Sequence, residues 1–154
     1  MVRYIVYYSI YLLFFSSINF ILKADNISKE IFFDVVQKKI IIEDKFPNDL
    51  NKIVNTWFNE KIKVNGFEGS LILILSNYDE NITNIEKGKK IDLSLDFYLE
   101  INNSSLSKKD SFSGAVRANS KITGNFKLNE FDELLLNSQH RLISILSDKL
   151  NSIN

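Results

Sequence analysis

The strongest constraint on the fold is an alternation of side chains between Ile91 and Asn102. Every odd position in this stretch is apolar, and the even positions are mostly polar or charged. Successive side chains of a strand point to opposite faces of a sheet, so the pattern predicts a strand with one buried face and one face open to water. The chain must therefore build a sheet that is covered on one side.

A second alternating stretch, residues 111–122, follows a polar loop of sequence NSSLSKKD, and here the apolar residues fall on even positions. If the loop is symmetric, the numbers of facing residues sum to 213, and opposite charges and apolar residues both face each other. The facing pairs are then Asp96 with Arg117, Asp92 with Lys121, Phe97 with Val116 and Leu95 with Ala118. We predict an antiparallel pair in this register.

The rest of the chain alternates between strand and helix patterns. Residues 31–42 are rich in β-branched and aromatic residues and predict a strand, with a change of phase near Gln37 that indicates a bulge or a break. Pro47 opens a predicted helix whose apolar face centres on Trp57, a predicted core residue, and Gly66 is placed to stop it. Residues 69–85 begin as a strand that is apolar on both faces.

A last helix is predicted from Asn129 as N-cap to the end of the chain, with His140 roughly opposite its apolar face. The element order is then β-α-β-β-β-α. A parallel crossover followed by a meander predicts an α+β fold, a two-layer sandwich of a mixed four-stranded sheet with both helices on one face. Residues 25–154 form a single domain in this interpretation.

The first 22 residues predict export. Arg3 is followed by a run without charge from Tyr4 to Leu22, which is how a secretory signal begins, and cleavage after Ala24 would leave a polar start. Left uncleaved, the run is long enough to span a bilayer as an anchor, and a third interpretation is a buried core helix. We therefore expect residues 1–24 to be a signal peptide or N-terminal membrane anchor, and the protein to be periplasmic or membrane-associated.

The residue types present exclude much chemistry. The chain has no cysteine and one histidine, so it has no thiolate metal site, no disulfide, no lipid-modified cysteine and no site built from several histidines. Lys plus Arg and Asp plus Glu both number 19, so no basic surplus favours nucleic acid. We predict no catalytic residue, no metal and no cofactor. Asp92, Asp96 and Glu100 are interpreted as a solvated row that pairs with cations of the next strand.

One surface stands out as a binding candidate. If Leu71, Leu73 and Leu75 face the helices, then Ile72 and Ile74 emerge on the opposite face. In an even-sum register with the next strand, Tyr78 and Tyr98 emerge there too. A two-layer domain leaves that face wet, so these residues predict either a partner-binding patch, formed by Ile72, Ile74, Tyr78 and Tyr98, or a strand that is covered on both sides.

The order of elements resembles small exported domains of the Gram-negative envelope. Two such families are the lipopolysaccharide-assembly lipoprotein and the auxiliary lipoproteins of ABC-type lipid transporters, and the spacing of Trp57, Gly66 and Gly69 before an apolar strand looks like a group of envelope lipoproteins. The resemblance covers most of residues 31–150 and implies an envelope accessory role. Those families carry a lipobox cysteine that this chain lacks, and no functional residue is carried over.

Three functional hypotheses follow. The first is a non-enzymatic envelope accessory or assembly protein that binds a protein partner, such as an outer-membrane or transporter component, through the sheet face. The second is a periplasmic carrier of a lipid or other apolar ligand, in a cavity lined by Phe97, Leu99, Leu142 and Trp57. The third is a hydrolase that uses His140. The edge strands are also free to pair with a second copy, and the sequence leaves the oligomeric state open.

Overall fold

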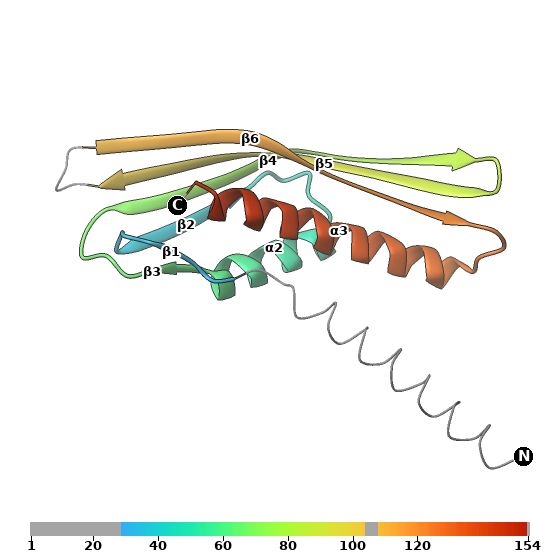
Figure 1. Ribbon diagram of the computed structural model, residues 1–154, viewed down its shortest axis with the longest axis horizontal. Coiled ribbons are helices and arrows are strands. Elements are labelled where there is room, and N and C mark those ends of the chain that lie inside the picture. The colour runs from blue at the N-terminus through green and yellow to red at the C-terminus, as the bar shows by residue number, and fades with distance from the viewer. Residues whose placement is uncertain (1–28, 104–107, 154) are drawn as a thin grey trace, which may run out of the picture.

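The computed structural model describes residues 29–103 and 108–153, so the predicted leader, residues 1–24, lies outside the described residues. A sheet forms one layer and the two helices form the other (Figure 1). In chain order the elements are β1 (Ile31–Phe33), β2 (Gln37–Ile42), α2 (Asn48–Lys61), β3 (Ile62–Val64), β4 (Ser70–Ile85), β5 (Gly88–Asn103), β6 (Lys108–Thr123) and α3 (Leu128–Asn151).

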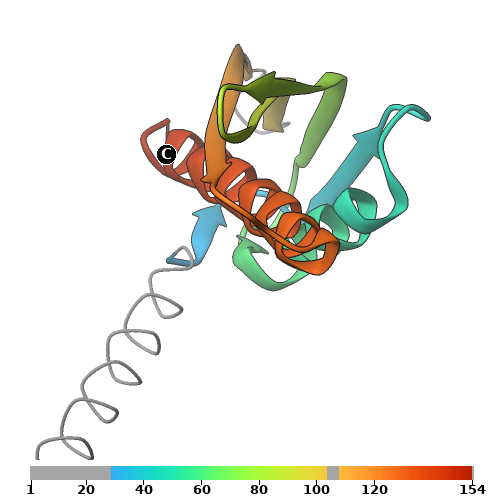
Figure 2. The same ribbon diagram turned by 90° about the vertical axis from the view of Figure 1, so that its right-hand side faces the viewer.

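The main sheet has the strand order β2-β4-β5-β6. β2 runs parallel to β4, because α2 carries the chain back across the sheet between them, and the two hairpins β4-β5 and β5-β6 are antiparallel. Seen along the long axis of the molecule, both helices lie on the same side of this sheet (Figure 2). This confirms the predicted α+β fold with a mixed four-stranded sheet.

A small parallel sheet of β1 and β3 adds to the predicted elements. The predicted first strand breaks at the change of phase, and its two parts pair with different partners, β1 with β3 and β2 with β4. Gly66 does not stop a helix, because α2 ends at Lys61 and β3 intervenes. Its backbone instead approaches the preceding loop so closely that a Cβ would lie 2.5 Å from the nitrogen of Val35.

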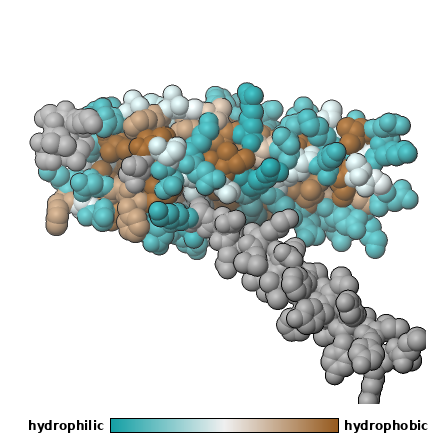
Figure 3. Space-filling model, in the orientation of Figure 1, coloured by the Kyte–Doolittle hydropathy of each residue, from teal (hydrophilic) through white to brown (hydrophobic). Residues whose placement is uncertain are grey.

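The core lies between the sheet and the helices. The odd residues of β5 from Ile91 to Leu99 are all at most 4 % exposed, as the alternation predicts. Trp57 is 6 % exposed, which confirms it as a core residue. In the space-filling view, hydrophobic side chains form an interrupted band along the body, with hydrophilic side chains above and below it (Figure 3).

The observed register of β5 with β6 differs from the predicted register by two residues. Facing residue numbers sum to 211, so Asp96 faces Ala115 and Arg117 faces Ser94. A shift of two residues leaves every side chain on the same face, so the faces predicted for both strands are right although the pairs are wrong. The predicted ion pairs fail for the same reason: Asp92 binds Lys90 of its own strand instead, with 2.8 Å between nitrogen and oxygen.

A bulge in β4 overturns the prediction for Tyr78. Up to Ser76 the residue numbers of β4 and β5 pairs sum to an even number, but the register shifts between Ser76 and Asp79, where Asn77 adopts a φ of 52°. The extra residue moves Tyr78 to the helix side, where its ring lies 5.4 Å from that of Phe46. Tyr78 therefore lies on the opposite side of the sheet from Ile74.

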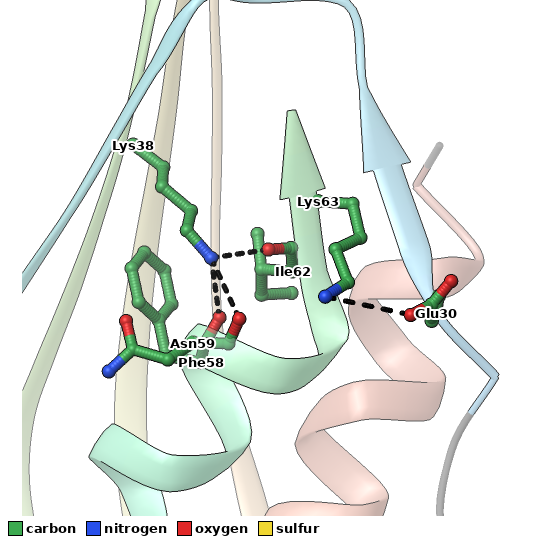
Figure 4. Close-up of polar contacts among 6 residues, drawn as sticks. All are labelled: Glu30, Lys38, Phe58, Asn59, Ile62 and Lys63. Atoms are coloured by element: carbon green, nitrogen blue, oxygen red, sulfur yellow. Dashed lines mark hydrogen bonds and ion pairs between the residues drawn. The ribbon is translucent and has the colours of Figure 1, made fainter. Parts of the chain in front are cut away.

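The carboxyl end of α2 is held by a lysine from the sheet. The ammonium of Lys38 in β2 donates to the carbonyl oxygens of Phe58, Asn59 and Ile62 at 3.0, 3.2 and 2.5 Å (Figure 4). A cation is favoured at this end of a helix, where unpaired carbonyl groups gather. Partial burial, with the nearby charge of Lys63, lowers the pKa of Lys38.

The last helix begins earlier than predicted. Its N-cap is Lys127 rather than Asn129, and the carboxylate of Glu130 accepts a hydrogen bond from the Lys127 N–H at 2.7 Å. This is the carboxylate half of a capping box, which the sequence alone would place two residues later. His140 is exposed, as its position opposite the apolar face predicts.

Candidate functional site: the outer face of the sheet

An apolar row crosses the face of the sheet that the helices leave uncovered. Ile41 of β2 pairs with Ile74 of β4, which pairs in turn with Tyr98 of β5. Because residues that face one another on paired strands point to the same side, these three side chains lie next to one another across three strands. Ile72, two residues before Ile74, widens the row. Ile41 is 40 % exposed, and the other three are partly exposed. These four residues are called the outer-face patch below.

Charged and polar groups surround the outer-face patch. The hydroxyl of Tyr98 donates to a carboxylate oxygen of Glu100 at 3.4 Å, and the same oxygen accepts from the ammonium of Lys109 at 3.0 Å. That hydrogen bond and the charge of Glu100 raise the pKa of Lys109. On the other side, the amide of Asn77 donates to Asp96 at 3.0 Å. An apolar centre inside a polar rim is the usual arrangement of a protein interface.

The side chains beyond Tyr98 are small. A shallow hollow of about 380 Å³ lies beside Tyr98, across β4, β5 and β6, and is lined in part by Ser76 of β4 and Ser113 of β6. Ser113 is the residue that pairs with Tyr98. The ring of Tyr98 therefore borders this hollow on the side of β6, in addition to facing out from the sheet.

The structure brings together three of the four predicted patch residues. Ile72, Ile74 and Tyr98 share the outer face as expected, and Tyr78 is excluded by the bulge. The sequence did not predict that Ile41 belongs to this face. The break near Gln37 resets the alternation of β2, and because residues 40–42 are all isoleucine, the sequence does not show which of them point outward. Only the pairing with β4 decides that Ile41 points outward.

A second hollow lies between the two helices. It has a volume of about 330 Å³ and is walled mainly by Ile53 and Trp57 of α2 and by Ile143 of α3. Lys52, Glu60, Lys61 and His140 are among the residues that line it. The indole Nε1 of Trp57 is buried without a hydrogen-bond partner among the described residues, which costs about 1–3 kcal/mol. No local sequence signal marks this helix groove, because it depends on how α2 and α3 pack.

The residues predicted to line a carrier cavity are part of the packed core. Phe97, Leu99, Leu142 and Trp57 are at most 6 % exposed and belong to one cluster of buried apolar side chains. Of the four, only Trp57 also lines the helix groove. An apolar ligand would therefore meet this protein between the helices rather than between sheet and helices.

Across residues 29–103 and 108–153, no three carboxylate or imidazole groups come close enough together to hold a metal ion. None of the helices in these ranges combines the length and the apolar character needed to cross a membrane.

Comparisons with other proteins give structural likenesses only. Neither family models nor curated proteins match the sequence. Among solved structures, a minor lipoprotein from Acinetobacter baumannii is 13 % identical with a TM-score of 0.47, covering 77 % of this chain and 90 % of that one. The rare lipoprotein B from Shewanella oneidensis is 10 % identical with a TM-score of 0.42, covering 75 % and 90 %. At these values no role of those proteins transfers to this chain.

Proposed function

We propose that this protein is an exported accessory protein of the cell envelope that binds a protein partner through the outer-face patch. The observation that carries the proposal is the register that aligns Ile41, Ile74 and Tyr98 across three strands, on the sheet face that α2 and α3 leave uncovered. Scattered single apolar residues are ordinary on a protein surface, whereas a contiguous group with a polar rim marks an interaction site. The apolar run from Tyr4 to Leu22 supports export.

The chemistry of the patch favours a protein partner. Tyr98 offers a large rigid ring with a hydroxyl, and aromatic residues of this kind dominate the energetics of protein interfaces. The isoleucines beside it are stiff side chains that lose little rotamer freedom when they are covered. The matching surface on the partner would be apolar at its centre, with polar groups opposite Glu100, Lys109 and Asp96.

The test is in-cell photocrosslinking from a probe at position 74 of the full chain, with the adduct identified by mass. We expect a protein adduct that is lost when Tyr98→Ala is added. Pull-down of that protein should fail with Ile74→Asp and persist with Ile82→Asp, a matched control on the same strand. Ile82 is 41 % exposed and pairs with Ile91, so it points to the helix side. Retained binding by Ile74→Asp would overturn the proposal.

A second candidate function, carriage of an apolar ligand, is favoured by the helix groove. Its volume of about 330 Å³ lies at the lower end for ligand pockets, and its walls are largely apolar. Lys52 and Lys61 at its border would suit an amphiphile with an anionic head. The ligand class is then a single acyl chain with a carboxylate or phosphate group.

The single tryptophan of the chain provides the test, because Trp57 lines the groove. Titration with a long-chain fatty acid should shift the Trp57 emission saturably, and Ile143→Glu should abolish the shift by placing a charge in the apolar wall. An emission spectrum that stays constant up to the solubility limit would exclude this function. The third hypothesis, a hydrolase that uses His140, stays a prediction. Hydrolase activity that is retained in His140→Ala would contradict it.

A further inference from the structure

The two edge strands of the main sheet, β6 and β2, differ in the contacts that their backbone groups make with the rest of the molecule. At the β6 edge, cations of α3 reach the strand: the ammonium of Lys149 donates to the carbonyl oxygen of Ala115 at 2.9 Å, and the guanidinium of Arg141 donates to that of Asn119 at 3.5 Å. Charged side chains on backbone acceptors are a known protection of an edge strand against pairing with another chain. At Ala115 and Asn119 the β6 edge is therefore closed by side chains of α3.

The β2 edge is open. The N–H of Glu43 donates to the carbonyl oxygen of Leu75 in β4 at 3.1 Å. Because both backbone groups of a residue in a parallel pair point the same way and the direction alternates, the groups of Ile40 and Ile42 point away from β4. Within residues 29–103 and 108–153, no hydrogen bond is found to these outward groups.

The side chains of β2 are also more exposed than those of β4 next to it. Ile40 and Ile42 point to the helix side, as Leu73 and Leu75 of β4 do, yet they are only partly buried while Leu73 and Leu75 are fully buried. Ile41 on the outer face is 40 % exposed. Three successive β-branched residues on an edge whose free backbone groups bind no described residue form the kind of strand that pairs with another strand.

The sequence around β2 is complementary to itself. In an antiparallel pair of two copies centred on Ile41, Ile41 meets Ile41 of the second copy, and Lys39 of each copy meets Glu43 of the other. The side chains of all three residues lie on the outer face of the sheet. Opposite charges and apolar side chains of the two copies therefore match on that one face. The carboxylate of Glu43 accepts a hydrogen bond from the N–H of Asn77 at 2.8 Å, which holds it at this end of β2.

We propose that the β2 edge pairs with the β2 edge of a second copy of this chain, in the antiparallel register centred on Ile41. Ile40 of each copy exchanges backbone hydrogen bonds with Ile42 of the other, and the two four-stranded sheets become continuous. Ile41 already aligns with Ile74 and Tyr98, so the outer-face patches of the two copies join into one apolar row across the two-fold axis. This pairing does not depend on the partner proposed for the outer-face patch.

The full chain suits a disulfide test, because it contains no cysteine of its own. In the proposed register the two residues at position 41 form a non-hydrogen-bonded pair with Cα atoms about 4.5 Å apart, within the range of a disulfide. We expect Ile41→Cys to give a covalent dimer under mild oxidation. Mixing tagged and untagged copies identifies the adduct as two copies of this chain. Lys121→Cys on the closed β6 edge is the matched control and should stay monomeric.

Two further variants check the register. Lys39→Cys and Glu43→Cys should each crosslink poorly alone and efficiently when mixed. Ile40→Pro, added to Ile41→Cys, should lower the dimer yield about tenfold or more, because it removes a donor that points to the second copy and not to β4. The proposal is overturned if Ile41→Cys stays monomeric in a folded chain, if its adduct contains another protein, or if Lys39→Cys crosslinks alone as well as Ile41→Cys does.

Discussion

The rings of Tyr78 and Phe46 lie 5.4 Å apart between centroids with a tilt of 40°. This contact joins β4 to the loop that precedes α2, and it exists because the bulge at Asn77 moves Tyr78 to the helix side of the sheet. Before the bulge, the even residues of β4 point outward; after it, they point to the helices. The bulge therefore sets where the outer-face patch ends along β4.

The left-handed backbone of Asn77 gives the first prediction. Asn77→Val should lower the free energy of unfolding by about 1–2 kcal/mol more than Asn77→Gly does, because a β-branched side chain is strained at a φ of 52°. Both variants lose the hydrogen bond from the Asn77 amide to Asp96, so their difference isolates the backbone. Urea unfolding of the two measures it, and equal stabilities would contradict a positive φ at this position.

Tyr78 predicts how stability changes at alkaline pH. Its burial, and then the hydrogen bond to and the charge of Glu80, raise its pKa well above the ordinary value of 10.0. The unfolded chain then releases this proton at a lower pH than the folded chain. Its contribution to stability is fully present below pH 10 and is lost as the pH rises beyond it. Stability measured from pH 9 to 11 should fall less steeply in Tyr78→Phe than in the wild type, and parallel curves would refute this assignment.

Lys38 should cost more stability to replace than an exposed lysine in the loop that follows β2. Lys38→Met removes the ammonium that binds three carbonyl oxygens at the end of α2, and we expect the free energy of unfolding to fall by about 1–3 kcal/mol. Lys45→Met, at an exposed position in the loop before α2, is the control and should change stability by less than about 0.5 kcal/mol. Denaturant melts of both variants decide; a similar loss in each would mean that the charge, not its position, matters.

Position 66 has no room for a side chain, so we expect only glycine to be tolerated there. A Cβ at this position would lie 2.5 Å from backbone atoms of Asp34 and Val35, so Gly66→Ala must push the β1-β2 connection away. We expect a loss of about 1–3 kcal/mol in the free energy of unfolding, against less than about 0.5 kcal/mol for the exposed neighbour in Asn65→Ala. Thermal unfolding compares the two. A stable Gly66→Ala would show that this connection relaxes freely.

Patterns along the sequence determined most of the elements and most of their faces, although they did not predict β3. The alternation of β5 and β6, the helical spacing around Trp57 and the change of phase near Gln37 depend only on the period of each element, which is local. For the same reason the sequence predicted that Ile72, Ile74 and Tyr98 share the face of the sheet opposite the helices, although it left open whether that face is covered. It also determined that the chain has no thiol chemistry, since it contains no cysteine.

Only the tertiary structure decided the features that depend on pairing. Registers two residues apart keep the same faces, so the sequence had no means of choosing between sums of 211 and 213 for β5 and β6. One extra residue at Asn77 reversed Tyr78, and the parity of the three isoleucines of β2 was settled by β4. The helix groove and the open β2 edge likewise arise from the packing of elements distant in sequence, where long-range contacts rather than local periodicity set the geometry.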